Sequence, residues 1–141
     1  MFTLTFRYVN HSSHGLPLDI SPVNAAFDIR ADEQVTLAPG ERKAIETRIK
    51  LLCDSGEMYR FVERSGLALN SGIEVKGGII DPDFVKYVKV ILKNDGDEPF
   101  YINIGDRISQ VLRLNVIVTP MECIADTQDN ERAGFGSSGV K

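Results

Sequence analysis

Four short segments carry the residue types from which a functional site could be built, and all four look like loops or loop edges rather than core. In chain order they are RSGLA (64–68), GGIIDPDF (77–84), GDRISQ (105–110) and GFGSSG (134–139). Each contains glycine, which allows the backbone to approach a ligand closely. Taken together, the four segments indicate a site for phosphate binding and proton transfer.

The RSGLA segment could hold phosphate oxygens. Arg64 offers a guanidinium, Ser65 a hydroxyl and Gly66 a backbone N–H at the predicted start of a helix, and these are groups that commonly bind phosphate. A turn with a surface arginine is the more frequent meaning of such a segment on its own.

Asp81 is the candidate general base. It follows two apolar residues and precedes Pro82, so its carboxylate is expected at the fixed end of a strand. The alternative is an aspartate that only caps a turn before proline.

The composition changes after Cys123. The segment 126–141 is polar and rich in glycine, and Phe135 is its single aromatic residue. Most tails of this kind are frayed termini. The bracketing of Phe135 by small residues also suits a segment that folds over a phosphate chain joined to a flat base.

The composition limits the class of protein. A chain of 141 residues predicts one domain, and the net charge of −4 argues against stable nucleic-acid binding. No apolar run approaches the roughly 20 residues that cross a bilayer, and no signal peptide is evident, so we expect an intracellular protein, cytoplasmic or nuclear, without membrane contact. Cys53 and Cys123 have no zinc or disulfide spacing and are expected as reduced core cysteines.

Alternating polar and apolar residues predict short strands separated by Gly, Pro and Asp turns. The strands are expected in the segments 2–8, 45–51, 58–62, 84–92, 100–104 and 108–114. One short helix is predicted over 65–70 with Ser65 as its N-cap. The fold class is therefore all-β, a β-sandwich, jelly roll or barrel.

Five motifs, in order, resemble those of the trimeric dUTPase family along almost the whole chain. They are AAFDIRA (25–31), RSGLA, GGIIDPDF, GDRISQVL (105–112) and ERAGFGSSG (131–139). The resemblance implies a jelly-roll subunit or distorted barrel in a homotrimer. It further implies a core over 1–125 and a flexible tail over 126–141 that carries the fifth motif.

The resemblance implies hydrolysis of dUTP to dUMP and pyrophosphate, with dUMP supplied for dTTP synthesis. Asp81 would activate the water that attacks the α-phosphorus. Mg²⁺ would be held chiefly by the phosphates and water, with Asp28 touching its water shell. The phosphate chain would be held by Arg64, Ser65, Gly66 and Gln110.

The same resemblance implies how the nucleoside would be read. The backbone around Gly78, Ile79 and Lys89 would pair with uracil, and Phe84 would pack on the deoxyribose. The tail of another chain would then close the site. Its contributing residues would be Arg132, Phe135, Gly136 and Ser137.

Several positions depart from the family pattern. Phe84 replaces a tyrosine, Glu63 a proline, and Lys89 a glycine, while the fifth motif is short between Arg132 and Phe135. The change at Glu63 places a carboxylate beside the phosphate segment, where it would repel the ligand. These departures keep an alternative open, a dUTPase-fold nucleotide-binding or regulatory protein with weak or lost catalysis. The dCTP deaminases of the same superfamily are disfavoured by the tail motif and by Asp81.

Overall fold

The computed structural model describes residues 6–16, 18, 24–54, 56–117 and 119–126 of the chain. Short strands dominate these residues, and one α-helix interrupts them. In chain order the elements are β1 (Arg7–Asn10), β2 (Phe27–Arg30), β3 (Val35–Leu37), β4 (Arg42–Glu46), β5 (Ile49–Leu52), β6 (Glu57–Val62), α1 (Ser65–Ser71), β7 (Ile73–Lys76), β8 (Ile79–Ile80), β9 (Lys89–Asn94), β10 (Phe100–Ile102) and β11 (Arg107–Asn115).

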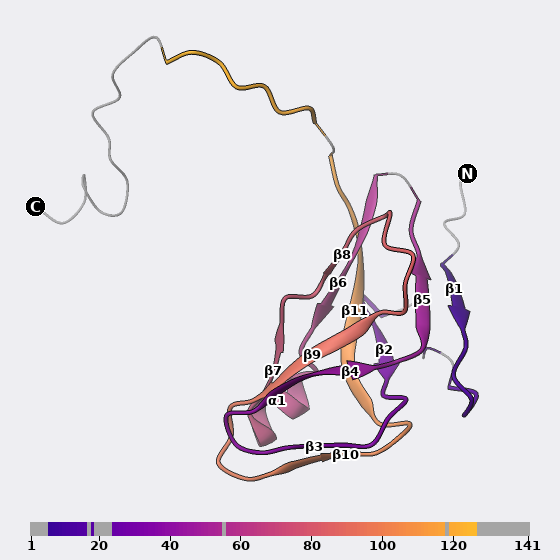
Figure 1. Cartoon of the computed structure of the whole chain (residues 1–141), viewed down its shortest axis with the longest axis vertical. Coiled ribbons are helices and arrows are strands. Elements are labelled where there is room, and N and C mark those ends of the chain that lie inside the picture. Colours follow the sequence, from indigo (N-terminus) through magenta and orange to yellow (C-terminus); the bar gives the residue numbers. More distant parts are fainter. Residues whose placement is uncertain (1–5, 17, 19–23, 55, 118, 127–141) are drawn as a thin grey trace, which may run out of the picture.

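A four-stranded antiparallel sheet carries parts of three of the motifs, AAFDIRA, GGIIDPDF and GDRISQVL. Its strand order is β2-β11-β6-β8, and Figure 1 shows β11 as the long orange strand near the middle of the molecule. The register places Gln110 of β11 opposite Asp28 of β2 on one side and opposite Val62 of β6 on the other. Three segments that are far apart in sequence therefore meet around Gln110.

A second sheet has the order β4-β9-β7, and the pairs β1-β5 and β10-β3 complete the strand arrangement of the described residues. The apolar faces of the two larger sheets share one core. Burial of each large apolar side chain contributes roughly 1.5–3 kcal/mol. Fully buried members are Ile29, Tyr59 and Val111 from the first sheet and Ile45, Val90 and Leu92 from the second. The predicted all-β jelly-roll class is confirmed.

The alternation through Ile45, Thr47, Ile49 and Leu51 correctly predicts a buried face, because all four side chains are buried. They belong to two strands, however, since Arg48 has a left-handed φ of 54° that ends β4 before β5 begins. The first predicted strand is seen only from β1 onward, because residues 2–5 lie outside the described residues.

Two sequence expectations outside the helix are wrong. The segment 84–92 is not a strand along its length, because β9 begins only at Lys89 and residues 81–88 form a loop in which the Phe84 N–H donates to the Asp81 carbonyl at 3.1 Å. Cys123 is not a core residue, since it is exposed on the segment that follows β11. Cys53 is partly buried, and this burial raises the pKa of its thiol.

The predicted helix exists as α1, but its N-cap differs from the expectation. Arg64, in an extended conformation, is the N-cap and makes no capping side-chain bond, while Ser65 already belongs to the helix. At the other end Gly72 is left-handed, and a Cβ there would lie 2.7 Å from the Gly96 nitrogen. Only glycine therefore permits the contact that fixes this end of α1.

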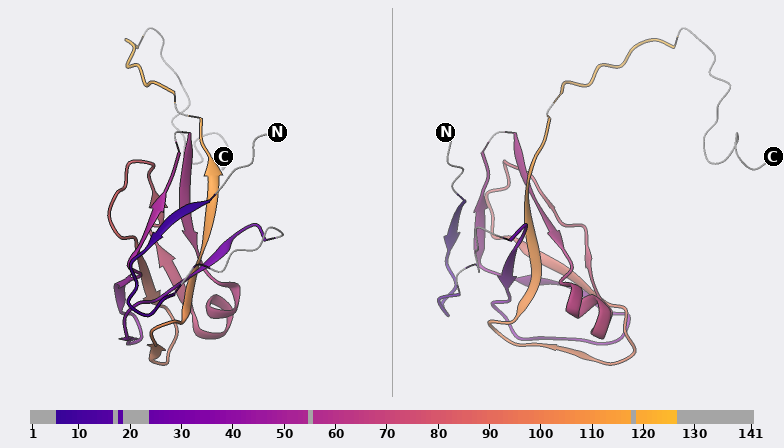
Figure 2. Two further views of the ribbon diagram at one scale, coloured as in Figure 1. Left: turned by 90° about the vertical axis from the view of Figure 1, so that its right-hand side faces the viewer. Right: turned by 180° about the vertical axis from the view of Figure 1, so that it is seen from behind.

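The segment after β11 extends away from the two sheets, as Figures 1 and 2 show. Three of its large apolar side chains are exposed, with exposed fractions of 92% at Ile117, 99% at Met121 and 76% at Ile124. The boundary between core and tail at 125/126 stays a prediction, because residues 127–141 are not described. Across the described ranges, we find no helix with the length and apolar character of a membrane span.

Candidate functional site

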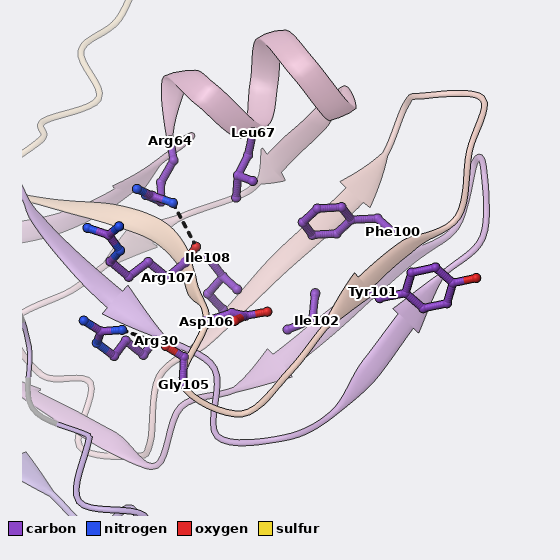
Figure 3. Close-up of a pocket in the computed structure, with 10 residues that line it drawn as sticks. All are labelled: Arg30, Arg64, Leu67, Phe100, Tyr101, Ile102, Gly105, Asp106, Arg107 and Ile108. Carbon is purple, nitrogen blue, oxygen red and sulfur yellow. Dashed lines mark hydrogen bonds between the residues drawn. The ribbon is translucent and has the colours of Figure 1, made fainter.

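A basic hollow of about 360 Å³ lies beside the start of α1. Three arginines line it, namely Arg30 from β2, Arg64 before α1 and Arg107 from β11 (Figure 3). Arg30 donates to the Gly105 carbonyl at 2.7 Å. The concentration of guanidinium groups makes this hollow suitable for an anion such as a phosphate chain.

Asp28 holds two of these arginines in place. Its Oδ1 lies 3.2 Å from Arg64 Nε, and its Oδ2 lies 3.5 Å from Arg107 Nη1. Arg64 Nη1 also donates to the Arg107 carbonyl at 3.3 Å. The guanidinium of Arg64 is thus pre-positioned, which lowers the entropy cost of binding an anion.

A β-bulge in β11 directs Arg107 outward. Its pairing with β2 shifts register between Arg107 and Ser109, so Ile108 and Ser109 are both buried while Arg107 is exposed. The Ser109 hydroxyl donates to the Val62 carbonyl at 2.8 Å. This bond ties the bulge to the end of β6, directly before the segment that bears Arg64, and such bulges commonly re-aim a side chain at a site.

Ser65 and Gly66 are exposed at the start of α1. A Cβ added at Gly66 would meet nothing within 4 Å, so this glycine is not needed for packing. Both residues are presented to solvent next to Arg64, where a ligand can reach their hydroxyl and backbone groups.

Glu63 was expected from its sequence position to repel a phosphate bound at Arg64, but its carboxylate is engaged elsewhere. Its Oε1 accepts a hydrogen bond from the Val75 backbone N–H at 3.0 Å. The carboxylate is therefore engaged with β7 on the other side of the segment, and its repulsion of an anion at Arg64 is reduced by distance and solvent screening.

A second hollow, of about 380 Å³, lies between β8 and β9 and is lined by Gly78, Ile79, Phe84 and Lys89 among others. Ile79 and Phe84 have exposed fractions of 64% and 38%. Gly78 has a φ of 107°, and a Cβ there would lie 3.0 Å from the Phe61 carbonyl oxygen. The hollow thus has an apolar wall and a close backbone approach, which suit a flat base and a sugar.

Lysines surround this second hollow. Lys89 Nζ lies 3.7 Å from Glu46, and Lys76 Nζ lies 2.8 Å from Glu74. The hydrogen bond to Glu74 raises the pKa of Lys76.

Asp81 directly follows β8, as expected, and its side chain is exposed. It stands far from Arg64 within one chain. Because β6 and β8 are antiparallel with Tyr59 opposite Ile80, Asp81 lies beyond Tyr59 towards the beginning of β6, whereas Arg64 follows its end. At 3.3 Å per residue the separation along the strand is about 20 Å.

Figure 1 shows the same separation, with α1 near the bottom of the view and the loop between β8 and β9 towards the top. The chain therefore brings Arg64, Ser65, Gly66, Gln110 and Asp28 together at one end, and Gly78, Ile79, Asp81, Phe84 and Lys89 together at the other. The predicted tail residues Arg132, Phe135, Gly136 and Ser137 lie outside the described residues.

No group of three or more His, Cys, Asp or Glu side chains that could hold a metal ion occurs among residues 6–16, 18, 24–54, 56–117 and 119–126. Asp28 Oδ1 is buried without a hydrogen bond but lies in the ion pair with Arg64, so this carboxylate already faces a cation. A metal at this end would therefore depend on a ligand's own oxygens and on water.

Arg30 and Arg107, which the structure places in the basic hollow, are not among the site residues predicted from the motifs. A signal was present, since both lie inside quoted motifs, AAFDIRA and GDRISQVL. Their direction depends on strand register and on the bulge, which those motifs do not reveal.

Residues 14–139 match the family model described as dUTPase. The deoxyuridine 5'-triphosphate nucleotidohydrolase of rabbitpox virus is 36% identical over 138 residues, which cover 96% of this chain and 93% of that protein. The monkeypox virus protein of the same name is also 36% identical, with 96% and 91% covered.

Solved structures show the same fold. The dUTPase of Staphylococcus bacteriophage 80alpha with dUpNHpp superposes with a TM-score of 0.82 at 22% identity, covering 98% of this chain and all of that one. A mutant dUTPase from phage phi11 of S. aureus, described with a structural Mg(II) ion, gives 0.80 at 17% identity, covering 89% of this chain and all of that one.

Proposed function

Because this chain belongs to the dUTPase family, we propose that it hydrolyses dUTP to dUMP and pyrophosphate. The reaction removes dUTP and supplies dUMP for dTTP synthesis. The observation that carries the proposal is the hollow at Arg64 and Arg107, where Asp28 holds two guanidinium groups ready for a phosphate chain. The viral relatives that carry the name of this activity cover nearly the whole chain.

In this proposal the phosphate end is bound by the residues around α1. Arg64 neutralises charge on the phosphates, Ser65 and Gly66 donate a hydroxyl and a backbone N–H, and Gln110 adds its amide. Their roles are mainly to hold the α-phosphorus in line with the attacking water, since positioning and electrostatic stabilisation supply most catalysis of phosphoryl transfer.

Asp81 orients and deprotonates the water. Its exposed carboxylate at the end of β8 can accept a proton once the substrate covers it. Uracil is read by backbone groups of Gly78, Ile79 and Lys89, and Phe84 packs on the deoxyribose and excludes a 2′-hydroxyl. The close contact of Gly78 with Phe61 fixes the backbone that faces the base.

The separation of about 20 Å between Arg64 and Asp81 along β6 supports a shared site in a homotrimer. One chain then supplies the phosphate end, a second supplies the uracil end, and the tail of another closes the site with Arg132, Phe135, Gly136 and Ser137. The exposed apolar side chains of the segment after β11 support burial against another copy.

Mg²⁺ is the proposed cofactor. It would be bound by the three phosphates and by water, and Asp28 would contact its water shell. The ion would neutralise charge on the phosphates.

The central test compares the parent protein with Asp81→Asn. Pyrophosphate release from dUTP with Mg²⁺ should fall by about 10²–10⁴ in kcat, while binding of dUpNHpp should stay near that of the parent. Asp83→Asn, which changes another exposed carboxylate of the same loop, serves as the matched control. A parent protein that releases no pyrophosphate, or an Asp81→Asn variant that retains full turnover, would refute the proposal.

A further inference from the structure

The loop 81–88 has few attachments before its last residue. Residues 81–86 are all exposed. Within the loop the Phe84 N–H donates to the Asp81 carbonyl. At the far end Val88 is buried, with its N–H bonded to the Ile49 carbonyl at 2.9 Å and its carbonyl bonded to the Thr47 hydroxyl at 2.7 Å.

Tyr87 is the side chain that ties the loop to the body. Its hydroxyl is hydrogen-bonded to His11 Nδ1, and the two rings meet edge to face with centroids 5.6 Å apart. Arg48 Cζ and Lys50 Nζ each lie 5.3 Å from the centre of the tyrosine ring. A phenol with two cations near its ring and a bonded hydroxyl is held firmly in orientation.

His11 and Arg48, which Tyr87 contacts, are themselves held in place by hydrogen bonds. The His11 N–H donates to the Arg48 carbonyl at 3.0 Å, and Arg48 Nε donates to the His11 carbonyl at 3.2 Å. β1 and β5 pair directly beside this contact, with Asn10 opposite Ile49. The tyrosine therefore docks on a rigid surface built by β1, β5 and the turn between β4 and β5.

Tyr87 and Phe84 line the same hollow of about 380 Å³. Loss of the contacts of Tyr87 would therefore shift the position of Phe84 in this hollow. It would also increase the mobility of the loop at Asp81. A displacement of about 1 Å in such a wall is enough to change catalysis strongly.

We infer that Tyr87 is a positioning residue, which anchors the loop 81–86 on His11, Arg48 and Lys50 and thereby sets the selection of deoxyribose over ribose. The inference rests on the proposed roles of Asp81 and Phe84. Tyr87 touches no reacting atom, and it acts through the loop alone.

The test is Tyr87→Phe in the full-length protein, because this change keeps the ring and its two cations and removes the bond to His11. We expect kcat/KM for dUTP to fall about five-fold, as for the loss of one hydrogen bond, and the preference for dUTP over UTP to narrow. Tyr8→Phe is the matched control, since Tyr8 is a half-buried residue of β1 for which the described residues offer no hydroxyl bond. It should leave both quantities unchanged.

His11→Ala should reproduce the effect of Tyr87→Phe, and the double variant should lose little more than either single one, because both remove the same bond. Parent-like kcat/KM and parent-like selection in Tyr87→Phe, or full additivity in the double variant, would overturn the inference. Loss of thermal stability with unchanged dUTP/UTP selection would also overturn it, since the anchor would then serve folding alone.

Failure of the inference is distinguishable from failure of the proposed function. If Asp81→Asn is inactive while Tyr87→Phe matches the parent, only the role of Tyr87 is refuted. If Asp81→Asn retains turnover, the proposed catalytic role is refuted whatever Tyr87→Phe does.

Discussion

The first motif led to a prediction for Asp28 that did not include its ion pairs with Arg64 and Arg107. The family resemblance implied a contact with the water shell of a metal. The structure also pairs both of its carboxylate oxygens with cations, Oδ1 with Arg64 and Oδ2 with Arg107. The two roles make different kinetic predictions.

For Asp28→Asn we expect KM for dUTP to rise about ten-fold, because the amide removes a charge that fixes two guanidinium groups. The measurement is steady-state turnover over a range of dUTP and Mg²⁺ concentrations. Asp54→Asn, at an exposed partner of Arg7, is the control. A changed Mg²⁺ requirement with an unaltered KM for dUTP would speak against the ion-pair role.

Ionisation of Tyr59 is expected to lower the unfolding free energy of the protein at high pH. Its ring is fully buried and its hydroxyl donates to the Leu52 carbonyl at 2.9 Å. Burial raises its pKa from 10.0 to about 12, so the stabilisation is complete below pH 10 and is lost as the pH rises through about 12. The maximum effect is about 2–3 kcal/mol.

Urea unfolding of the parent between pH 8 and 12, compared with Tyr59→Phe, measures this contribution. The difference in unfolding free energy between the two proteins should shrink across that range. A constant difference would show that ionisation of Tyr59 is not coupled to folding.

At the scale of the element, the alternation of polar and apolar residues predicted strands correctly wherever one face of the strand is buried. β6 and β11 lie close to their predicted ranges for this reason. The prediction of a strand over 84–92 was wrong at its start, because residues 84–86 are exposed in a loop, and alternation cannot distinguish a half-buried strand from such a loop. The helix was found, but the extended Arg64 took the N-cap that Ser65 was expected to occupy.

The contact between α1 and the turn after β9 is a further element that alternation could not reveal. A Cβ at Gly96 would lie 2.6 Å from the Ser71 carbonyl oxygen, although its φ is not left-handed. Gly96→Ala should therefore destabilise the protein by about 1–3 kcal/mol through overpacking.

Urea unfolding is the measurement, and Asp97→Ala, at an exposed position of the same turn, is the control. Equal stabilities of Gly96→Ala and the parent would mean that α1 shifts freely to accept the added methyl group.

At the scale of the whole molecule, the motifs predicted some residues of each hollow, such as Arg64 in one and Phe84 in the other, but they did not predict how far apart the two hollows lie. This separation follows from the antiparallel register of β6 and β8, which depends on tertiary pairing. The same motifs also predict the tail that lies beyond the described residues, and its contribution to turnover can be measured directly.

A chain truncated after Ala125 should keep the proposed trimeric assembly by light scattering, because the segment with Ile117 and Met121 is retained. Its turnover of dUTP should fall at least about 100-fold, since the closed site would no longer exclude water. A fully active truncated protein would contradict the role of the tail.

The register of β6 and β8 also bears on genetics. If the two ends of each site come from different chains, an Asp81→Asn chain and an Arg64→Ala chain are each defective for a reason that the other can repair. Co-expression of the two in equal amounts would yield randomly assembled trimers, and about one site in four, averaged over all of them, would have both intact residues. Two inactive alleles would then complement each other.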